Sequence, residues 1–416
     1  ARIAAQGRRI GLGIAEMQGQ VPAGAGELER NGAADAACRT GDQYTRTRSH
    51  GFYNAAMPAS EQSTSVSAPL HRQIGREIAA AGGWLPFDRY MALALYAPGL
   101  GYYARGDRQF GAWPASGSDF VTAPELSPVF GQCLAEQLRQ ALQACGAHTI
   151  VEFGAGSGAL AETLLDSLGD VVRDYHIVDV SGSLRAQQGE RLRRFGSRVQ
   201  WLDRWPEAMR AVVIGNEVLD AMPVKLLAWD GRQWHERGVA WHDDGPCRAD
   251  RPTRLRPPVE AAFVPGTVIE LHPQAEAFIA SLAEHLAHGV AFFFDYGFPE
   301  SEYYHPQRTG GTLMCHRAHQ ADTDPLVDVG DKDITAHVNF TGIALAAQAA
   351  GLDVLGYTSQ GRFLLNCGIA ARMQAATVQA RACSLKLRPS PGRVGTSMRP
   401  SRISRRSLNS GSSQSK

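Results

Sequence analysis

The sequence lacks the marks of several protein classes. No stretch of its 416 residues approaches the ~18 consecutive apolar residues of a membrane-spanning helix, so no membrane span is predicted. Its seven cysteines are scattered and odd in number, and no two of them form a C-x-x-C pair. This pattern is typical of reduced thiols in a reducing compartment. Cys315, His316 and His319 lie close together but lack a partner pair at zinc-finger spacing, so no metal is predicted.

The chain also lacks a strong net charge. Its formal charge is +1, but residues 374–416 hold nine Lys and Arg and no Asp or Glu, so the middle of the chain is net acidic. An acidic core does not indicate a nucleic-acid binder, and no D/N-P-P-Y-like segment follows the predicted fourth strand. Such a core would tolerate a basic substrate such as an arginine-containing protein, although weakly acidic cores are also simply soluble ones.

Neither end of the chain shows the periodicity of a packed domain. Residues 1–66 are rich in Gly, Ala, Ser and Arg, and they lack the hydrophobic core of a signal peptide and the composition of a convincing transit peptide. We predict that they form a disordered or non-native extension. Residues 374–416 are rich in Ser, Pro and Arg and are predicted to form a disordered basic tail.

The most informative stretch is residues 149–160, TIVEFGAGSGAL. Its apolar start predicts a buried strand, and the apolar periodicity that follows predicts a helix. Between them, Gly154, Gly156 and Gly158 stand at alternate positions, and Glu152 lies two residues before the first of them. Glycines let the backbone adopt open dihedral angles and lie against a ligand at the helix N-terminus. The E-x-G-x-G-x-G pattern resembles motif I of S-adenosylmethionine-dependent methyltransferases; a nucleotide site and an ordinary tight turn remain alternatives.

The next predicted strand, residues 175–180, places Asp179 at its C-terminal end. An acid a little over ~20 residues beyond such glycines holds the ribose hydroxyls in Rossmann-like units. Alternatively, Asp179 could cap the helix that starts near Ser181. The ribose role is the preferred interpretation.

Further acids follow the later strands of the predicted sheet. Residues 211–216 form a buried strand ending at Asn216, and Glu217 and Asp220 come next. Two carboxylates three residues apart could hold a guanidinium through paired, charge-assisted hydrogen bonds; alternatively, Asp220 caps a helix and Glu217 faces water. Asp295 ends the fifth strand, residues 290–294, and is the next candidate. Because ligands bind at the carboxyl ends of such strands, we predict catalytic roles for these acids.

Two segments depart from this α/β pattern: one precedes it and the other interrupts it. Residues 67–130 are predicted to form a helical N-terminal element and an active-site loop, whose Asp119, Thr122 and Glu125 either close over a ligand or pack against the domain. Residues from about 226 to 273 interrupt the rhythm and are predicted to be an insertion that begins with a hairpin.

Several motifs in order carry a family resemblance. They are GYY at 101–103, SDFVTAPELSPVFG, VEFGAGSGALAETLL, YHIVDVSGSLRAQQ, GNEVLDAMPV, FDYG, DITAHVNF and SQGRFLLNCGI. Together they resemble the MidA-like family, which includes arginine methyltransferases of mitochondrial complex I assembly. The resemblance spans roughly residues 70–373, and so many ordered motifs make it highly specific.

The resemblance implies an α/β class I methyltransferase fold, with a Rossmann-like doubly wound sheet in a domain over residues 131–373. It implies S-adenosyl-L-methionine as the methyl donor and symmetric dimethylation of an arginine on a respiratory complex I subunit. The predicted compartment is a bacterial cytoplasm or, alternatively, the mitochondrial matrix. Other possibilities are methylation of a small molecule and a non-catalytic assembly chaperone, and nothing predicts the oligomeric state. The predicted cofactor-binding residues are Glu152, Gly154, Gly156, Gly158, Asp179 and Asn216.

The chain departs from the family pattern at three places. Ser118 replaces the glycine of a GDF loop, and Asp179 stands where Glu is usual. After residue 369 the chain runs into its basic tail, where family members continue into a helix and a last strand. We therefore expect that the sheet could lack its seventh strand and leave an exposed edge.

Overall fold

The computed structural model describes residues 10–17, 67–105, 122–243, 245–317 and 319–375. Residues up to Ile369 form one unit, which contains the central sheet. The strands of this sheet lie in the order β16 (Asp353–Ser359), β1 (Ile10–Met17), β11 (Leu286–Phe298), β6 (Met209–Asn216), β3 (Thr149–Phe153), β4 (Asp174–Val178) and β5 (Val199–Leu202), with β15 (Val338–Asn339) paired to the end of β11.

All neighbouring strands of the central sheet are parallel. From β3 the chain proceeds outward through β4 and β5, and then returns to the other side of β3 with β6. The strand order therefore reverses between β3 and β6, and open α/β sheets bind ligands at the carboxyl ends beside such a reversal. The predicted α/β, Rossmann-like doubly wound architecture is confirmed.

Helices cover both faces of this sheet because successive strand residues point to opposite sides. On one face, α4 (Pro128–Cys145) and α5 (Ala159–Leu168) pack on Ile150, Val212 and Ile214. On the other, α7 (Pro273–His285) and α9 (Phe340–Ala349) pack on Val151 and Val213. The sheet is buried on both sides, and α6 (Gly182–Leu192) connects β4 to β5.

The strand β1 corrects two predictions. Residues 10–17 were assigned to an extension outside the fold, but they pair in parallel with β11, from Ile10 opposite Gly289 to Met17 opposite Tyr296, and with β16 on the other side. With β1 the described path of the sheet has seven strands, so the expectation that a seventh strand is missing is wrong. The remainder of residues 1–66 and the tail from 376 lie outside the described residues.

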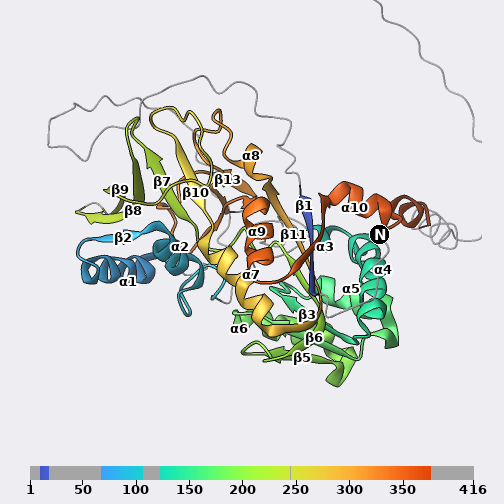
Figure 1. Ribbon diagram of the computed structural model, residues 1–416. Coiled ribbons are helices and arrows are strands. Elements are labelled where there is room, and N and C mark those ends of the chain that lie inside the picture. Colours follow the sequence, from blue (N-terminus) through green and yellow to red (C-terminus); the bar gives the residue numbers. More distant parts are fainter. Residues whose placement is uncertain (1–9, 18–66, 106–121, 244, 318, 376–416) are drawn as a thin grey trace, which may run out of the picture. The chain divides into compact units, whose positions relative to one another are not determined.

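A second sheet combines the predicted insertion with an early strand. It contains β2 (Trp84–Pro86), β7 (Lys225–Trp229), β8 (Trp234–His242), β9 (Gly245–Pro252) and β10 (Val268–Leu271), and its pairings are antiparallel. The hairpin predicted within residues 226–241 is confirmed as β7 and β8. The predicted helices α1 (Ser67–Ala80) and α2 (Phe87–Tyr96) form a core with this sheet, so they pack mainly on the insertion (Figure 1).

A third, small sheet contributes residues to the cleft at the carboxyl ends of the central strands. It contains β12 (Met314–Arg317), β13 (Gln320–Asp322) and β14 (Asp333–Thr335). The short helices α3 (Ala123–Leu126), α8 (Glu300–Tyr303) and α10 (Gln360–Asn366) complete the named elements. Within the described residues, no helix is long and apolar enough to cross a membrane.

Candidate active site

A cleft of about 1360 Å³ lies at the carboxyl ends of β3, β4, β6 and β11, beside the point where the strand order reverses. Seven of the nine residues predicted for the site line it: Glu152, Gly154, Gly156, Asp179, Asn216, Glu217 and Asp220. The two that do not line it are Gly158 and Asp295. The cleft thus brings together predicted residues from the ends of three strands, β3, β4 and β6.

The glycine turn forms one wall of the cleft. Gly154 and Gly156 have φ angles of 62° and 54°, in the left-handed region that favours glycine. The Gly154 N–H donates to the Val178 carbonyl at 3.0 Å, which fixes the turn to β4. A Cβ at Gly154 would lie 3.2 Å from the Val218 side chain. Gly158 lies behind this wall as the N-cap of α5, so its role is to close the turn.

Glu152 lies at the end of β3 below the turn. Its side chain is 2% exposed and accepts a hydrogen bond of 2.7 Å from the Tyr175 hydroxyl. Burial, together with the nearby Asp179 charge, raises the pKa of Glu152 to about 7. The residue therefore borders the cleft as a largely buried acid fixed by one phenol.

Asp179 lies at the end of β4 and faces the cleft. Its carboxylate accepts hydrogen bonds of 2.9 Å from the Ser181 N–H and from the Gln188 side-chain amide. The N-cap of α6 is Ser181, whose hydroxyl accepts from the Leu184 N–H at 3.3 Å. The alternative in which Asp179 itself caps the helix is therefore wrong. Burial raises the pKa of Asp179. Because its carboxylate lies at the strand end and lines the cleft, we keep the ribose role as a proposal.

Gln188 is a residue that the sequence reasoning missed. It is fully buried in α6, and its amide nitrogen donates both to Asp179 and to the Gly156 carbonyl, at 2.9 and 2.8 Å. Its oxygen accepts from the Trp201 indole at 2.8 Å. Gln188 thus links the glycine turn to the acid of β4. The sequence could have indicated Gln188, because it is a polar residue between Leu184 and Leu192 on the buried stripe of the helix.

The predicted active-site loop packs against the glycine turn. The Ser157 hydroxyl donates to the Glu125 carboxylate, and Arg191 from α6 donates to Ser157. Arg191 also lies 3.7 Å from Glu125 in an ion pair. Thr122 and Glu125 both line the cleft, whereas Ser118 and Asp119 lie outside the described residues.

The end of β6 carries Asn216 and Glu217. Glu217 has a φ angle of 53°, an unusual value for a residue with a side chain, and its N–H donates to the Phe294 carbonyl at 2.8 Å. Such backbone strain is concentrated at functional sites. The Glu217 carboxylate accepts from the Asn216 side-chain nitrogen at 3.2 Å. The Asn216 side-chain oxygen is buried and has no hydrogen-bond partner among the described residues, so it can accept from a ligand.

Asp295 occupies a different place from the one predicted. It is 1% exposed and lies behind the cleft, where its carboxylate accepts from the backbone N–H groups of Val218, Leu219 and Tyr296 at 3.1, 2.8 and 2.9 Å. These bonds hold the turn that carries Glu217 and Asp220. Because Asp295 does not line the cleft, we propose a positioning role for it in place of contact with a substrate.

Asp333 in β14 is a further acid of the cleft wall that the sequence reasoning did not assign. It is 3% exposed, and its segment is joined to the turn after β6 by a 2.9 Å hydrogen bond from the Ala336 N–H to the Asp220 carbonyl. Burial and the charges of Asp295 and Asp333 raise the pKa of Glu217 to about 8. Burial and the same neighbours also raise the pKa of Asp220. The cleft wall therefore contains a cluster of three acids, Glu217, Asp220 and Asp333, in which burial and neighbouring charges disfavour the ionised forms of Glu217 and Asp220.

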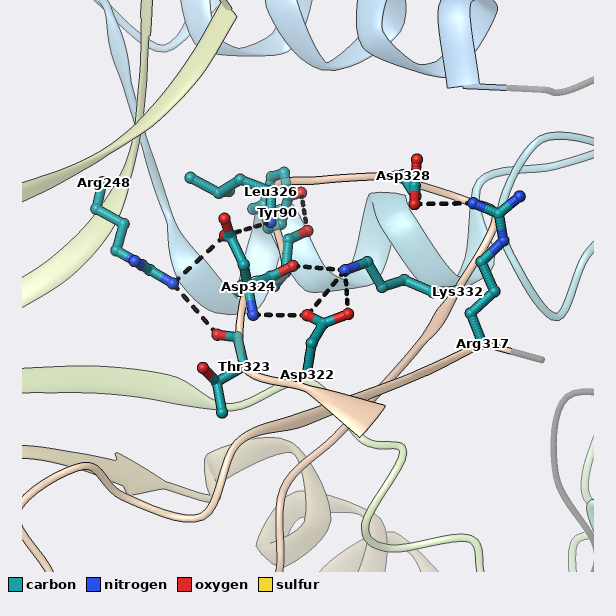
Figure 2. A network of polar contacts seen from close by, with 10 residues as sticks. Tyr90, Arg248, Arg317, Asp322, Thr323, Asp324, Leu326, Asp328 and Lys332 are labelled. Carbon is teal, nitrogen blue, oxygen red and sulfur yellow. Dashed lines mark hydrogen bonds and ion pairs between the residues drawn. The ribbon is translucent and has the colours of Figure 1, made fainter. Parts of the chain in front are cut away.

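A buried lysine precedes Asp333. The Lys332 ammonium donates to both carboxylate oxygens of Asp322 at 2.9 and 2.8 Å and to the Asp324 carbonyl at 2.9 Å (Figure 2). The same loop accepts at the Pro325 carbonyl from the Tyr90 hydroxyl of α2 at 2.7 Å. This network anchors the segment that presents Asp333 to the cleft.

Two tyrosines complete the acidic end of the cleft. Tyr96 and Tyr103 have stacked rings with centroids 5.6 Å apart, and the Tyr96 hydroxyl donates to the Ala221 carbonyl at 2.8 Å. Both line the cleft. Tyr103 belongs to the GYY motif, one of the motifs of the family resemblance, for which no role was predicted.

No group of three or more metal-ligating side chains occurs within the described ranges. Cys315 is buried in β12, and His316 beside it lines the cleft.

Comparisons with known proteins decide the family. Residues 133–358 match the sequence profile of a family described as S-adenosyl-L-methionine-dependent methyltransferases. The chain belongs to this family. It is 48% identical to a protein from Burkholderia thailandensis whose crystal structure holds S-adenosyl-homocysteine, with a TM-score of 0.73 and coverage of 77% of this chain and 86% of that one.

Curated relatives agree at lower identity. The chain is 28% identical over 354 residues to "Protein arginine methyltransferase NDUFAF7, mitochondrial" of Danio rerio, covering 75% of this chain and 79% of the relative. It is 27% identical to the Homo sapiens protein of the same name, covering 76% of each. The predictions of the family, of a methyltransferase and of S-adenosyl-L-methionine as cofactor are thereby confirmed.

The residues present fit this cofactor. The turn at Gly154 and Gly156, whose φ angles are both in the left-handed region, brings bare backbone to the cleft wall. The buried Asn216 oxygen needs a donor, which an amino group of the cofactor would supply. Asp179 presents a carboxylate at the next strand end, where hydroxyl groups of a ribose can donate to it.

Proposed function

We propose that this methyltransferase modifies the guanidinium group of an arginine in a protein substrate. The observation that carries the proposal is the cluster of Glu217, Asp220 and Asp333 in the wall of the cofactor cleft. The names of the curated relatives point to the same substrate class.

The electrostatics of the cluster favour a cationic ligand. Among the described residues, no Lys or Arg forms an ion pair with Glu217 or Asp220, and burial raises the pKa of both acids. A guanidinium in the cleft would supply the missing positive charge and favour the ionised carboxylates. Its planar set of N–H donors also matches carboxylates bidentately. A neutral small molecule would not compensate the free-energy cost of ionising these buried acids.

The reaction follows from these positions. When bound, the cofactor supplies a methyl group on a positively charged sulfur. Glu217 and Asp220 would hold two edges of the guanidinium and direct its remaining nitrogen toward the glycine turn, so that the new N–C bond forms in line with the C–S bond that breaks. The attacking nitrogen must lose a proton. Glu217, ionised once the guanidinium is bound beside it, would accept this proton as the N–C bond forms.

The finer assignment rests on the sequence resemblance. We propose a subunit of respiratory complex I as the protein substrate and symmetric dimethylation as the product. The word mitochondrial in the names of the relatives supports the mitochondrial matrix as the compartment. For a bacterial chain, the corresponding compartment is the cytoplasm. An assembly chaperone that binds the cofactor and transfers nothing is the competing proposal.

One experiment separates enzyme from chaperone. The protein is incubated with isotopically labelled S-adenosyl-L-methionine and a mixture of bacterial complex I subunits, and modified peptides are identified by mass spectrometry. We expect label on arginine, lost by roughly two orders of magnitude or more in Glu217→Gln and retained in the matched variant Glu284→Gln, whose acid is exposed on α7. Labelled lysine, or no label with intact cofactor binding, would contradict the proposal.

A further inference from the structure

The cleft continues beyond the acidic cluster. Its wall follows the segment from Asp333 through Thr335 and Ala336 to His337, and four residues of extended chain span at most about 13 Å. Arg308, His316 and Phe298 line the same cleft. The cleft thus has an acidic end at Asp333 and a second end built around a guanidinium and two imidazoles.

The basic end has side-chain nitrogens without partners. The Arg308 guanidinium lies 4.4 Å from the centroid of the Phe298 ring, and its buried Nε has no hydrogen-bond partner among the described residues. The same is true of the buried Nδ1 of His337, whose ring centroid lies 5.2 Å from that of Phe298. Leaving buried polar groups unsatisfied is costly, so the Arg308 Nε–H indicates a place where a ligand supplies an acceptor, and His337 can donate to the same acceptor in the tautomer with its proton on Nδ1.

No acid among the residues that the structure describes fills this role. Glu302 also lines the cleft, but it is exposed, and no described carboxylate lies within 4.0 Å of the Arg308 guanidinium. Burial and the Arg308 charge lower the pKa of His337, which leaves Arg308 as the main charge at this end. An anionic ligand group would be attracted to it at close range.

We infer that Arg308 and His337 form a subsite for the carboxylate of an Asp or Glu that neighbours the target arginine in the substrate. The inference rests on the proposed function and adds a substrate sequence preference to it. An arginine carboxylate contact can be bidentate and charge-assisted. With acids at one end of the cleft and Arg308 at the other, a peptide with an adjacent arginine and acid matches both ends in one orientation.

The test uses peptides with a single arginine flanked by Asp, Asn or Lys at each neighbouring position. For the wild-type protein, we expect kcat/KM to be about tenfold or more higher with Asp than with Asn at one position, and lowest with Lys. In Arg308→Gln this ratio should fall close to one, and in Arg308→Glu the Lys peptide should become the preferred one. Arg251→Gln is the matched control, because Arg251 also stacks on an aromatic ring, Trp84 at 4.7 Å, but does not line the cleft.

Two further measurements keep the outcomes distinct. If Arg308→Gln weakens binding of S-adenosyl-homocysteine about tenfold, Arg308 serves the cofactor, and the inference is overturned. Equal loss for all peptides in Arg308→Gln also overturns it. Calorimetric binding of the peptides with S-adenosyl-homocysteine present reports the preference without turnover. Preferential binding of the Asp peptide without methyl transfer would support the subsite and reject the enzyme, whereas absence of any preference would reject the subsite.

Discussion

Replacing Glu217 by Gln should make the stability of the protein less dependent on pH. Burial and neighbouring acids raise the pKa of Glu217 from 4.5 to about 8 in the folded protein. A carboxyl whose pKa is raised by folding stabilises the fold fully below about pH 4.5, and this contribution is lost as the pH rises through about 8. The wild-type protein therefore loses stability across this window, and Glu217→Gln should lose less.

The size of the effect follows from the pKa values. At 1.36 kcal/mol for each pH unit, the change from 4.5 to about 8 corresponds to an upper limit near 5 kcal/mol. Water reaches Glu217 through the cleft, so we expect roughly 2–4 kcal/mol. Between pH 5 and 9, the free energy of unfolding of Glu217→Gln should rise by this amount relative to that of the wild type.

Denaturant titrations at one-unit pH steps measure this difference. Glu284→Gln is the control, because its exposed acid should give a nearly constant difference from the wild type. A constant difference for Glu217→Gln as well would refute the buried-acid account of the cleft. If the unfolding free energy of Glu217→Gln instead fell with pH relative to that of the wild type, the sign would be reversed and the account would also be refuted.

Three other predictions test the cofactor side and the sheet. Gly156→Val forces a branched side chain into a left-handed turn and should abolish calorimetric binding of S-adenosyl-homocysteine; unchanged affinity would reject the glycine-turn assignment. Gln188→Leu should weaken that binding by about tenfold while circular dichroism shows an intact fold, and an unaltered Kd would remove the positioning role. Deletion of residues 1–17 should cost roughly 3 kcal/mol or more of unfolding free energy, because two backbone ladders of β1 are lost; deletion of residues 1–9 is the control, and equal stability of both would contradict the pairing.

The parts of the fold that the sequence predicted are those with local signals. The turn from Gly154 to Gly158 lies between an apolar strand and an apolar helix stripe, so its position follows from a dozen adjacent residues. The acids Asp179, Glu217 and Asp220 could be selected because each follows a buried strand, and parallel strands place their carboxyl ends at one edge.

The remaining features depend on contacts between distant segments. The strand at residues 10–17 pairs through its backbone with strands near the other end of the chain, which local periodicity does not reveal. Asp333 reaches the cleft because its loop is fixed by Lys332 and by the Ala336 bond to Asp220. Asp295 was expected to end its strand, as Glu217 follows β6, but β11 continues to Phe298, so Asp295 lies within the strand as a buried backbone acceptor. The sequence around Asp295 does not show how deeply its side chain is buried.

The central claim is that the buried acids of the cleft bind the guanidinium of the substrate. Calorimetric titration of an arginine peptide at pH 7, in buffers with different ionisation enthalpies and with S-adenosyl-homocysteine present, measures the protons released on binding. Because Glu217 has a pKa of about 8 in the free protein, we expect release of about one proton with the wild type and clearly less with Glu217→Gln. Binding of the peptide without proton release, or with the same release in both proteins, would contradict the claim.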